Sequence, residues 1–234
     1  VPVRPRPRVG VLATGDELVE IGEVPGPGQI RNTNETMLAA QVEAAGGEAV
    51  LLGIARDRPE HLAERIEAGL DTDILLLSGG VSAGRLDLVP AQLAAAGVEP
   101  VFHKVQVKPG KPLWFGIHQH PHSGRCCAVF GLPGNPVSSM VCFELFVRTA
   151  LRRLTGHRET RPASLSARLT TLHATRGDRP TYFPARLDRR AAETVVTPVD
   201  WHGSSDLRAT VDANAMILFP PGERTYQPDD LVDV

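Results

Sequence analysis

Apolar, β-branched runs alternate with helix-like segments along the first two-thirds of the chain, and this alternation restricts the fold more than any other feature. Most of these runs are apolar at consecutive positions, which is typical of strands buried on both faces. Alternating strands and helices predict a three-layer α/β domain with a mostly parallel sheet. The strands are predicted at residues 8–14, 49–55, 73–77, 101–107, 113–117 and 126–130. The helices are predicted to begin near residues 32–34, at 59, at 86 and at 136.

The pattern changes after Gly156, where short period-two runs are separated by turn signals. This pattern predicts a small all-β domain, either a barrel or a sandwich. Its strands are expected at residues 164–171, 182–188, 194–199 and 215–219. We therefore expect an α/β domain over residues 1–157 and a barrel-like domain over residues 158–234.

Charge and composition exclude several classes of partner. The formal net charge is -2, which gives no general attraction to nucleic acid or to an anionic membrane. No apolar stretch is long enough to span a bilayer. Three cysteines without metal-binding spacing fit a reducing environment, so a cytoplasmic location is expected. Residues 1–8 alternate Pro and Arg like a linker, so the chain is expected to be part of a longer protein.

Three glycine-rich loops follow predicted strands: TGDEL from Thr14, SGGVSAG from Ser78 and GLPGNP from Gly131. In parallel sheets, ligands bind at the carboxyl ends of the strands. SGGVSAG can bring backbone amides close to an anion, or it can be a plain tight turn, and the segment alone favours neither. In GLPGNP, Asn135 is expected to cap the following helix, whose N-terminus also favours an anion.

Charged residues lie in or beside these loops. Lys108 and Lys111 flank a rigid Pro-Gly turn and could meet a phosphate or a similar oxyanion, although a solvated loop is the commoner role of such a segment. Four carboxylates follow predicted strands and together suggest Mg²⁺: Asp16, Glu17, Asp57 and Asp87. The histidines of residues 118–122 are instead expected to lie in an exposed hairpin.

Six segments in the same order resemble the MoeA family of molybdopterin molybdenumtransferases and the homologous gephyrin E domain. They are TGDEL, GQIRNTN, GIARDRP, SGGVSAGRLD, KPGKP and GLPGNPVS. The C-terminal segment DLRATVDANAMILFP is also similar to that family, so the resemblance covers nearly the whole chain. Family members usually begin with two further domains, so this chain is expected to be a C-terminal portion.

The resemblance implies that adenylylated molybdopterin and molybdate are converted to molybdenum cofactor and AMP with Mg²⁺, by a homodimer. It implies active-site and metal-binding roles for Glu17, Asp57 and Asp87, and anion contacts for Lys108 and Lys111. It also implies a substrate cradle formed by Thr14, Gly15, Ser78, Gly79, Gly80, Ser82, Pro133, Gly134, Asn135 and Pro136. By the same resemblance, Arg179 and Ser205 reach the molybdate pocket.

Other interpretations remain open from the sequence. A molybdopterin adenylyltransferase shares the α/β domain. Such enzymes usually carry threonine at the position of Val81 and lack the β-rich tail that this chain has. A non-catalytic binding or scaffold module would keep the fold without turnover. Arg85 stands where the family more often has an acid. A nicotinamide-binding fold is disfavoured because GxGxxG is absent after the first strand.

Overall fold

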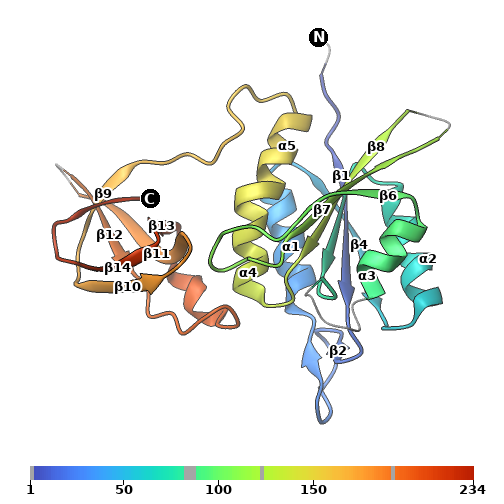
Figure 1. The fold of residues 1–234 in the computed structure, drawn as a ribbon, viewed down its shortest axis with the longest axis horizontal. Helices are drawn as coiled ribbons and strands as arrows, with labels where there is room; N and C mark the ends of the chain where they lie inside the picture. The colour runs from blue at the N-terminus through green and yellow to red at the C-terminus, as the bar shows by residue number, and fades with distance from the viewer. Residues whose placement is uncertain (1–2, 82–87, 122–123, 191–192) are drawn as a thin grey trace.

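The computed structural model describes residues 3–81, 88–121, 124–190 and 193–234. Its first part contains a six-stranded sheet in the order β4-β1-β5-β8-β7-β6 (Figure 1). The strands are β1 (Arg8–Thr14), β4 (Glu48–Ala55), β5 (Ile74–Ser78), β6 (Val98–His103), β7 (Trp114–Gln119) and β8 (Cys126–Leu132). β4, β1, β5 and β8 pair in parallel, whereas β7 runs antiparallel to both of its neighbours. The predicted mostly parallel sheet is confirmed.

Helices cover both faces of this sheet (Figure 1). On one face lie α2 (Pro59–Leu70) and α3 (Leu88–Ala95). On the other lie α1 (Thr33–Ala44), α4 (Pro136–Cys142) and α5 (Arg148–Leu154), with one π-helical turn (Phe143–Val147) joining the last two. Leu75 and Leu77 of β5 pack toward α2 and α3, while Leu76 packs toward α1. Both faces of β5 are therefore buried, and residues 74–77 are apolar at consecutive positions, because successive residues of a strand point to opposite faces.

Strand β6 differs from its predicted range, residues 101–107. It begins three residues earlier, at Val98, and ends at His103, because Lys104 has a φ of 71°. A positive φ interrupts the extended backbone that a β-ladder needs. The chain turns there, and the amides of Lys104 and Val105 donate to the carbonyls of Leu113 and Lys111.

The second part is a closed barrel in the order β11-β12-β9-β15-β13. Its strands are β9 (Ser166–Leu169), β11 (Thr181–Arg190), β12 (Glu193–Pro198), β13 (Ala215–Phe219) and β15 (Leu231–Asp233). Leu169, Val196, Ile217 and Phe219 fill its core. A separate antiparallel pair joins β10 (His173–Gly177) to β14 (Gly222–Tyr226). The sequence did not predict β10, β14 or β15, since these short segments lack a clear apolar alternation.

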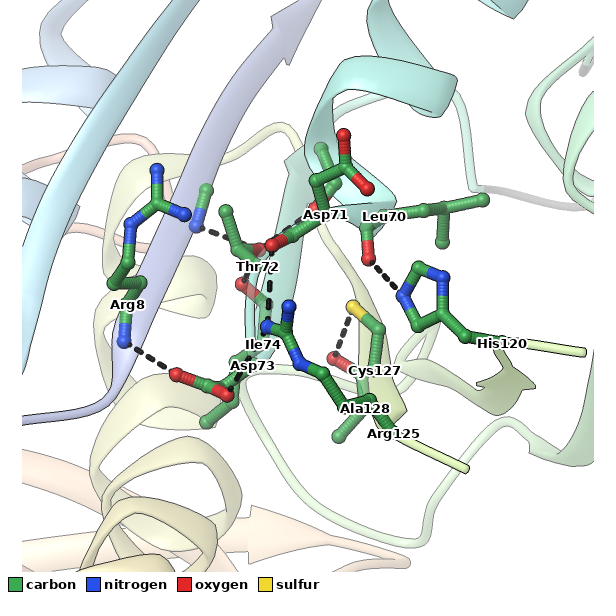
Figure 2. Close-up of polar contacts among 12 residues, drawn as sticks. Arg8, Leu70, Asp71, Thr72, Asp73, Ile74, His120, Arg125, Cys127 and Ala128 are labelled. Carbon is green, nitrogen blue, oxygen red and sulfur yellow. Dashed lines mark hydrogen bonds and ion pairs between the residues drawn. The ribbon is translucent and has the colours of Figure 1, made fainter. Parts of the chain in front are cut away.

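A polar cluster lies where the parallel strands begin, opposite the glycine-rich loops (Figure 2). The Asp73 carboxylate accepts the Arg8 amide at 2.8 Å, and its other oxygen is 3.7 Å from the Arg125 guanidinium. The ring of His120 contacts the Leu70 carbonyl at 2.9 Å. β7 and β8 form the predicted antiparallel hairpin, but His118 lies within β7 and is half-buried, as is His120, whereas His122 falls outside the described residues. The ring of His120 thus contacts the backbone at the end of α2, at the opposite end of the sheet from the predicted site.

A short arm extends from the carboxyl end of the sheet, where β2 (Leu18–Val19) pairs in parallel with β3 (Ile30–Arg31) (Figure 1). Among the described residues, no helix combines the length and the apolar character needed to cross a membrane.

Candidate functional site

The loops at the carboxyl ends of β1, β5 and β8 surround a cavity of about 870 Å³, here called the larger cavity. The arm and the N-terminus of α1 complete its wall. The predicted site residues that line it are Thr14, Glu17, Ser78, Gly79, Gly80, Pro133, Gly134, Asn135, Pro136 and Ser205. The topology therefore gathers residues that are almost two hundred positions apart in the sequence.

Glycines at the end of β5 allow the close packing of this wall. Gly79 and Gly80 have φ values of 99° and 63°, a region that L-residues rarely adopt. A Cβ on Gly79 would lie 2.7 Å from the carbonyl oxygen of Thr14, and a Cβ on Gly80 would lie 2.9 Å from its Oγ1. The Gly79 amide donates to Leu132 O at 3.1 Å, so the two glycine-rich loops are held together.

Asn34 is a cavity residue that the site prediction missed, although the GQIRNTN segment contains it. Its Nδ2 donates to Ser78 Oγ at 2.7 Å and to Gly134 O at 2.8 Å. It stands in the first turn of α1, which Asn32 caps by accepting the Glu35 amide at 3.3 Å. The capping signal in the sequence indicates only a helix start, because the partners of Asn34 are 44 and 100 residues away.

The expected side-chain cap at Asn135 is wrong. Asn135 occupies the N-cap position of α4, but its side chain makes no capping hydrogen bond. Its Nδ2 donates instead to Ser204 Oγ at 2.9 Å, and the Val137 amide donates to Ser204 O. The side chain is therefore used to dock the barrel part against the α/β part.

A second cavity, of about 490 Å³, lies between the two parts of the chain. Lys108, Lys111 and Arg179 line it, together with Phe183 and Trp201. The residues found to line it include no carboxylate, so we call it the cationic cavity. Pro112, Pro133 and Asn135 line both cavities, which are therefore adjacent.

Arg179 is held in place by two contacts. Its Nη1 donates to Val107 O at 3.1 Å, and its Nε lies 3.2 Å from the carboxylate of Asp178. Hydrogen bonding by Arg179 lowers the pKa of Asp178, with a smaller contribution from the charge of Lys111. Because Asp178 is largely exposed, water screens this pair and leaves the guanidinium available to an anion in the cavity.

Several predicted site residues lie elsewhere. Gly15 is buried, and its amide donates to Ala55 O rather than lining either cavity. Ser205 lines the larger cavity, and its neighbour Ser204 lines the cationic one. Asp57 is exposed and lines neither cavity, and its amide donates to Asp16 Oδ1 at 3.2 Å. Ser82, Arg85 and Asp87 fall outside the described residues.

The carboxylates of the described residues do not assemble a complete metal site. Of the predicted metal ligands, Glu17 lines the larger cavity, and its side chain folds over Gly15. Across the part of the chain that the structure describes, no three His, Cys, Asp or Glu side chains are grouped to hold a metal ion.

Residues 10–153 match the model of a family described as a probable molybdopterin binding domain, which spans more than half of the chain. The chain belongs to this family. Residues 166–234 of this molybdopterin-binding family member match the MoeA C-terminal region, domain IV. The resemblance to MoeA proteins is therefore confirmed.

Relatives of this family member agree with that assignment. The molybdopterin molybdenumtransferase of Bacillus subtilis (strain 168) is 33% identical over all of this chain and 53% of its own length. That of Nostoc sp. is 34% identical over 95% of this chain and 51% of its own. A crystal structure of a molybdopterin biosynthesis MoeA protein from Pyrococcus horikoshii superposes with a TM-score of 0.80 at 30% identity, covering 98% of this chain and 54% of that one. The chain thus spans about half the length of the relatives that it matches.

Proposed function

We propose that this chain carries the catalytic region of a molybdopterin molybdenumtransferase. Adenylylated molybdopterin would occupy the larger cavity, and molybdate would occupy the cationic cavity beside it. The products would be molybdenum cofactor and AMP. The location is cytoplasmic in this proposal, and the working form is a homodimer.

The observation that carries this proposal is the adjacency of two chemically different cavities. The larger cavity offers hydroxyl, amide and glycine backbone groups, which suit a large polar substrate. The cationic cavity offers two ammonium groups and a guanidinium, which suit a small oxyanion. Their shared residues, Pro112, Pro133 and Asn135, would keep the two substrates within reach of each other.

The acidic residues fit Mg²⁺ when the substrate supplies most of its ligands. Mg²⁺ is commonly held by one or two carboxylates together with substrate phosphates and water. Glu17 is placed in the larger cavity to provide such a carboxylate. Asp57 and Asp87 remain proposed ligands by family resemblance. Bound there, Mg²⁺ would lessen the charge on the phosphate oxygens.

The reaction requires no nucleophile from the protein, because water or an oxygen of molybdate would attack one phosphorus atom while AMP leaves. The bond that breaks joins two phosphate groups, so negative charge develops on phosphoryl oxygens. Lys108 and Lys111, which line the adjacent cationic cavity, would stabilise that charge. Positioning of the two substrates would contribute most of the remaining rate enhancement.

Release of AMP provides the direct test. Purified chain would be mixed with adenylylated molybdopterin, Mg²⁺ and molybdate, with a matched reaction lacking molybdate. AMP release that depends on molybdate supports the proposal. Binding of the pterin substrate without AMP release would identify a binding module or a catalytically incomplete region. Absence of both from a folded sample would contradict the proposal.

Glu17→Gln tests the acidic side of the site, because it removes one charge with little change in size. The proposal predicts a higher Mg²⁺ requirement for AMP release. An unchanged Mg²⁺ dependence would remove Glu17 from the proposed ligands. Glu64→Gln, on the exposed side of α2, provides the control.

A further inference from the structure

Two polar atoms in the wall of the larger cavity are buried without a hydrogen-bond partner among the described residues. They are Thr14 Oγ1 and Asn34 Oδ1. Thr14 is only 4% exposed, and both residues line the cavity. Buried polar atoms normally have partners, so each of these two atoms calls for one from a water molecule or from a ligand group in the cavity.

The orientation of the Asn34 amide follows from its contacts. One of its partners, Gly134 O, is a carbonyl oxygen and can only accept a hydrogen bond. The atom that faces it must therefore be Nδ2, which also donates to Ser78 Oγ. Oδ1 is consequently the free end of the amide. It can accept a hydrogen bond but cannot donate one.

This arrangement restricts what can bind near Asn34. A fully ionised phosphate or molybdate has only acceptor oxygens, so it cannot satisfy Oδ1. An N–H group of a heterocycle can satisfy it, and Thr14 Oγ1 can accept or donate beside it. Anions have a better position in the cationic cavity, near Lys108 and Lys111.

We propose that Asn34, with Thr14 beside it, recognises the amino-bearing edge of the pterin ring. The inference rests on the proposed function, since it takes the pterin substrate as given. It sets the direction in which the substrate lies: the ring edge faces the N-terminus of α1, and the anionic end faces the cationic cavity. Asn34 also positions the two glycine-rich loops through Ser78 and Gly134.

Two small probes distinguish recognition from support of the loops. Pterin carries the ring amino group and an adjacent ring N–H, whereas 1,3-dimethyllumazine has carbonyl and N-methyl groups on that edge and no N–H donor. We expect the full chain to bind pterin about tenfold more tightly than 1,3-dimethyllumazine, because 1,3-dimethyllumazine would leave Oδ1 unpaired. Fluorescence titration of each compound gives the ratio of the two dissociation constants. The variants are Asn34→Ala, Asn34→Asp and the control Thr36→Ala, an exposed position of α1 that does not line the cavity.

Asn34→Ala should bind pterin about tenfold more weakly and lose the preference over 1,3-dimethyllumazine. Asn34→Asp keeps acceptor oxygens but loses both N–H bonds, so it should weaken both probes while still preferring pterin. Thr36→Ala should match the unmodified chain. Thermal unfolding of each variant confirms that it is folded.

An unchanged ratio of the dissociation constants for pterin and 1,3-dimethyllumazine in folded Asn34→Ala would overturn the inference and leave the proposed function standing. The same holds if the unmodified chain binds both probes equally. If the folded chain binds neither probe, the pterin substrate itself is contradicted, and the inference falls with it.

Discussion

Lys108 and Thr181 form a parallel β-bridge that joins the α/β part to the barrel. The Lys108 amide donates to Pro180 O at 2.9 Å, and the Tyr182 amide donates to Lys108 O at 2.8 Å. The bridge fixes the KPGKP turn beside the start of β11, only two residues from Arg179. The cationic cavity therefore depends on both parts of the chain and on the contact between them.

Removing a lysine from the cationic cavity should weaken molybdate binding. In Lys108→Ala and Lys111→Ala, we expect the molybdate concentration for half-maximal AMP release to rise about tenfold or more, since a charge-assisted contact contributes about 1.5–3 kcal/mol. Isothermal titration with molybdate measures binding without turnover. Arg189→Ala removes an exposed cation near the far end of β11 and should change neither value. Equal effects in all three variants would indicate a general loss of charge.

A side chain at Gly80 should disturb both the fold and the larger cavity. In Gly80→Ala, the new Cβ would lie 2.5 Å from Val89 Cγ2. The alanine would also have to adopt a φ of 63°, which L-residues rarely do. The free energy of unfolding should fall by about 1–3 kcal/mol. Gly177→Ala is the matched control, because nothing lies within 4 Å of its Cβ. Denaturant unfolding measures the free energy of unfolding of both variants. Equal values would show that the loop adjusts to the new side chain without loss of stability.

The three cysteines should differ sharply in reactivity. Burial raises the pKa of Cys127 and of Cys142 to about 12, whereas Cys126 is exposed. At pH 8 only about one buried thiol in ten thousand is ionised at such a pKa, and the thiolate is the reactive form. Brief iodoacetamide treatment followed by mass spectrometry should find Cys126 alkylated and the other two intact. Rapid alkylation of Cys142 would show that α4 moves away from the sheet on this timescale.

The same thiols give a pH dependence with a definite sign. Their folded pKa values lie above the ordinary value of 9.0, so folding favours the neutral form. The stabilisation is complete below pH 9.0 and is lost as the pH rises toward about 12. Cys142→Ala should have a flatter decline in thermal stability over this range than the unmodified chain. Equal declines in the thermal stability of this variant and of the unmodified chain would contradict the raised pKa of Cys142.

His173 should make the barrel part sensitive to acid. Burial lowers its pKa below 6.5, and its ring stacks on Phe219 at 4.7 Å between centroids. The folded state favours neutral imidazole, so stability is present above pH 6.5 and is lost as the pH falls through the lowered pKa. His173→Phe should therefore lose less thermal stability than the unmodified chain between pH 7 and pH 5. His61→Phe, on α2, serves as the comparison.

The sequence determined the layered α/β fold and most of the loops of the candidate site. Continuous apolar runs such as that of β5 predict burial on both faces, and glycine-rich segments after such runs predict the cavity edge. These signals are local, because strand pattern and backbone freedom depend on neighbouring residues. For the same reason, the sequence alone is enough to single out Gly79 and Gly80.

Only the tertiary structure decided which distant residues meet. Asn135 binds Ser204 and does not cap its helix with its side chain. Asn34 binds Ser78 and Gly134. These contacts join segments that lie 44 to 100 residues apart. The exclusion of Asp57 from both cavities also follows from packing. Residue types and spacing indicate which hydrogen bonds a side chain can make. The actual partner depends on the strands and loops that the folded sheet brings side by side.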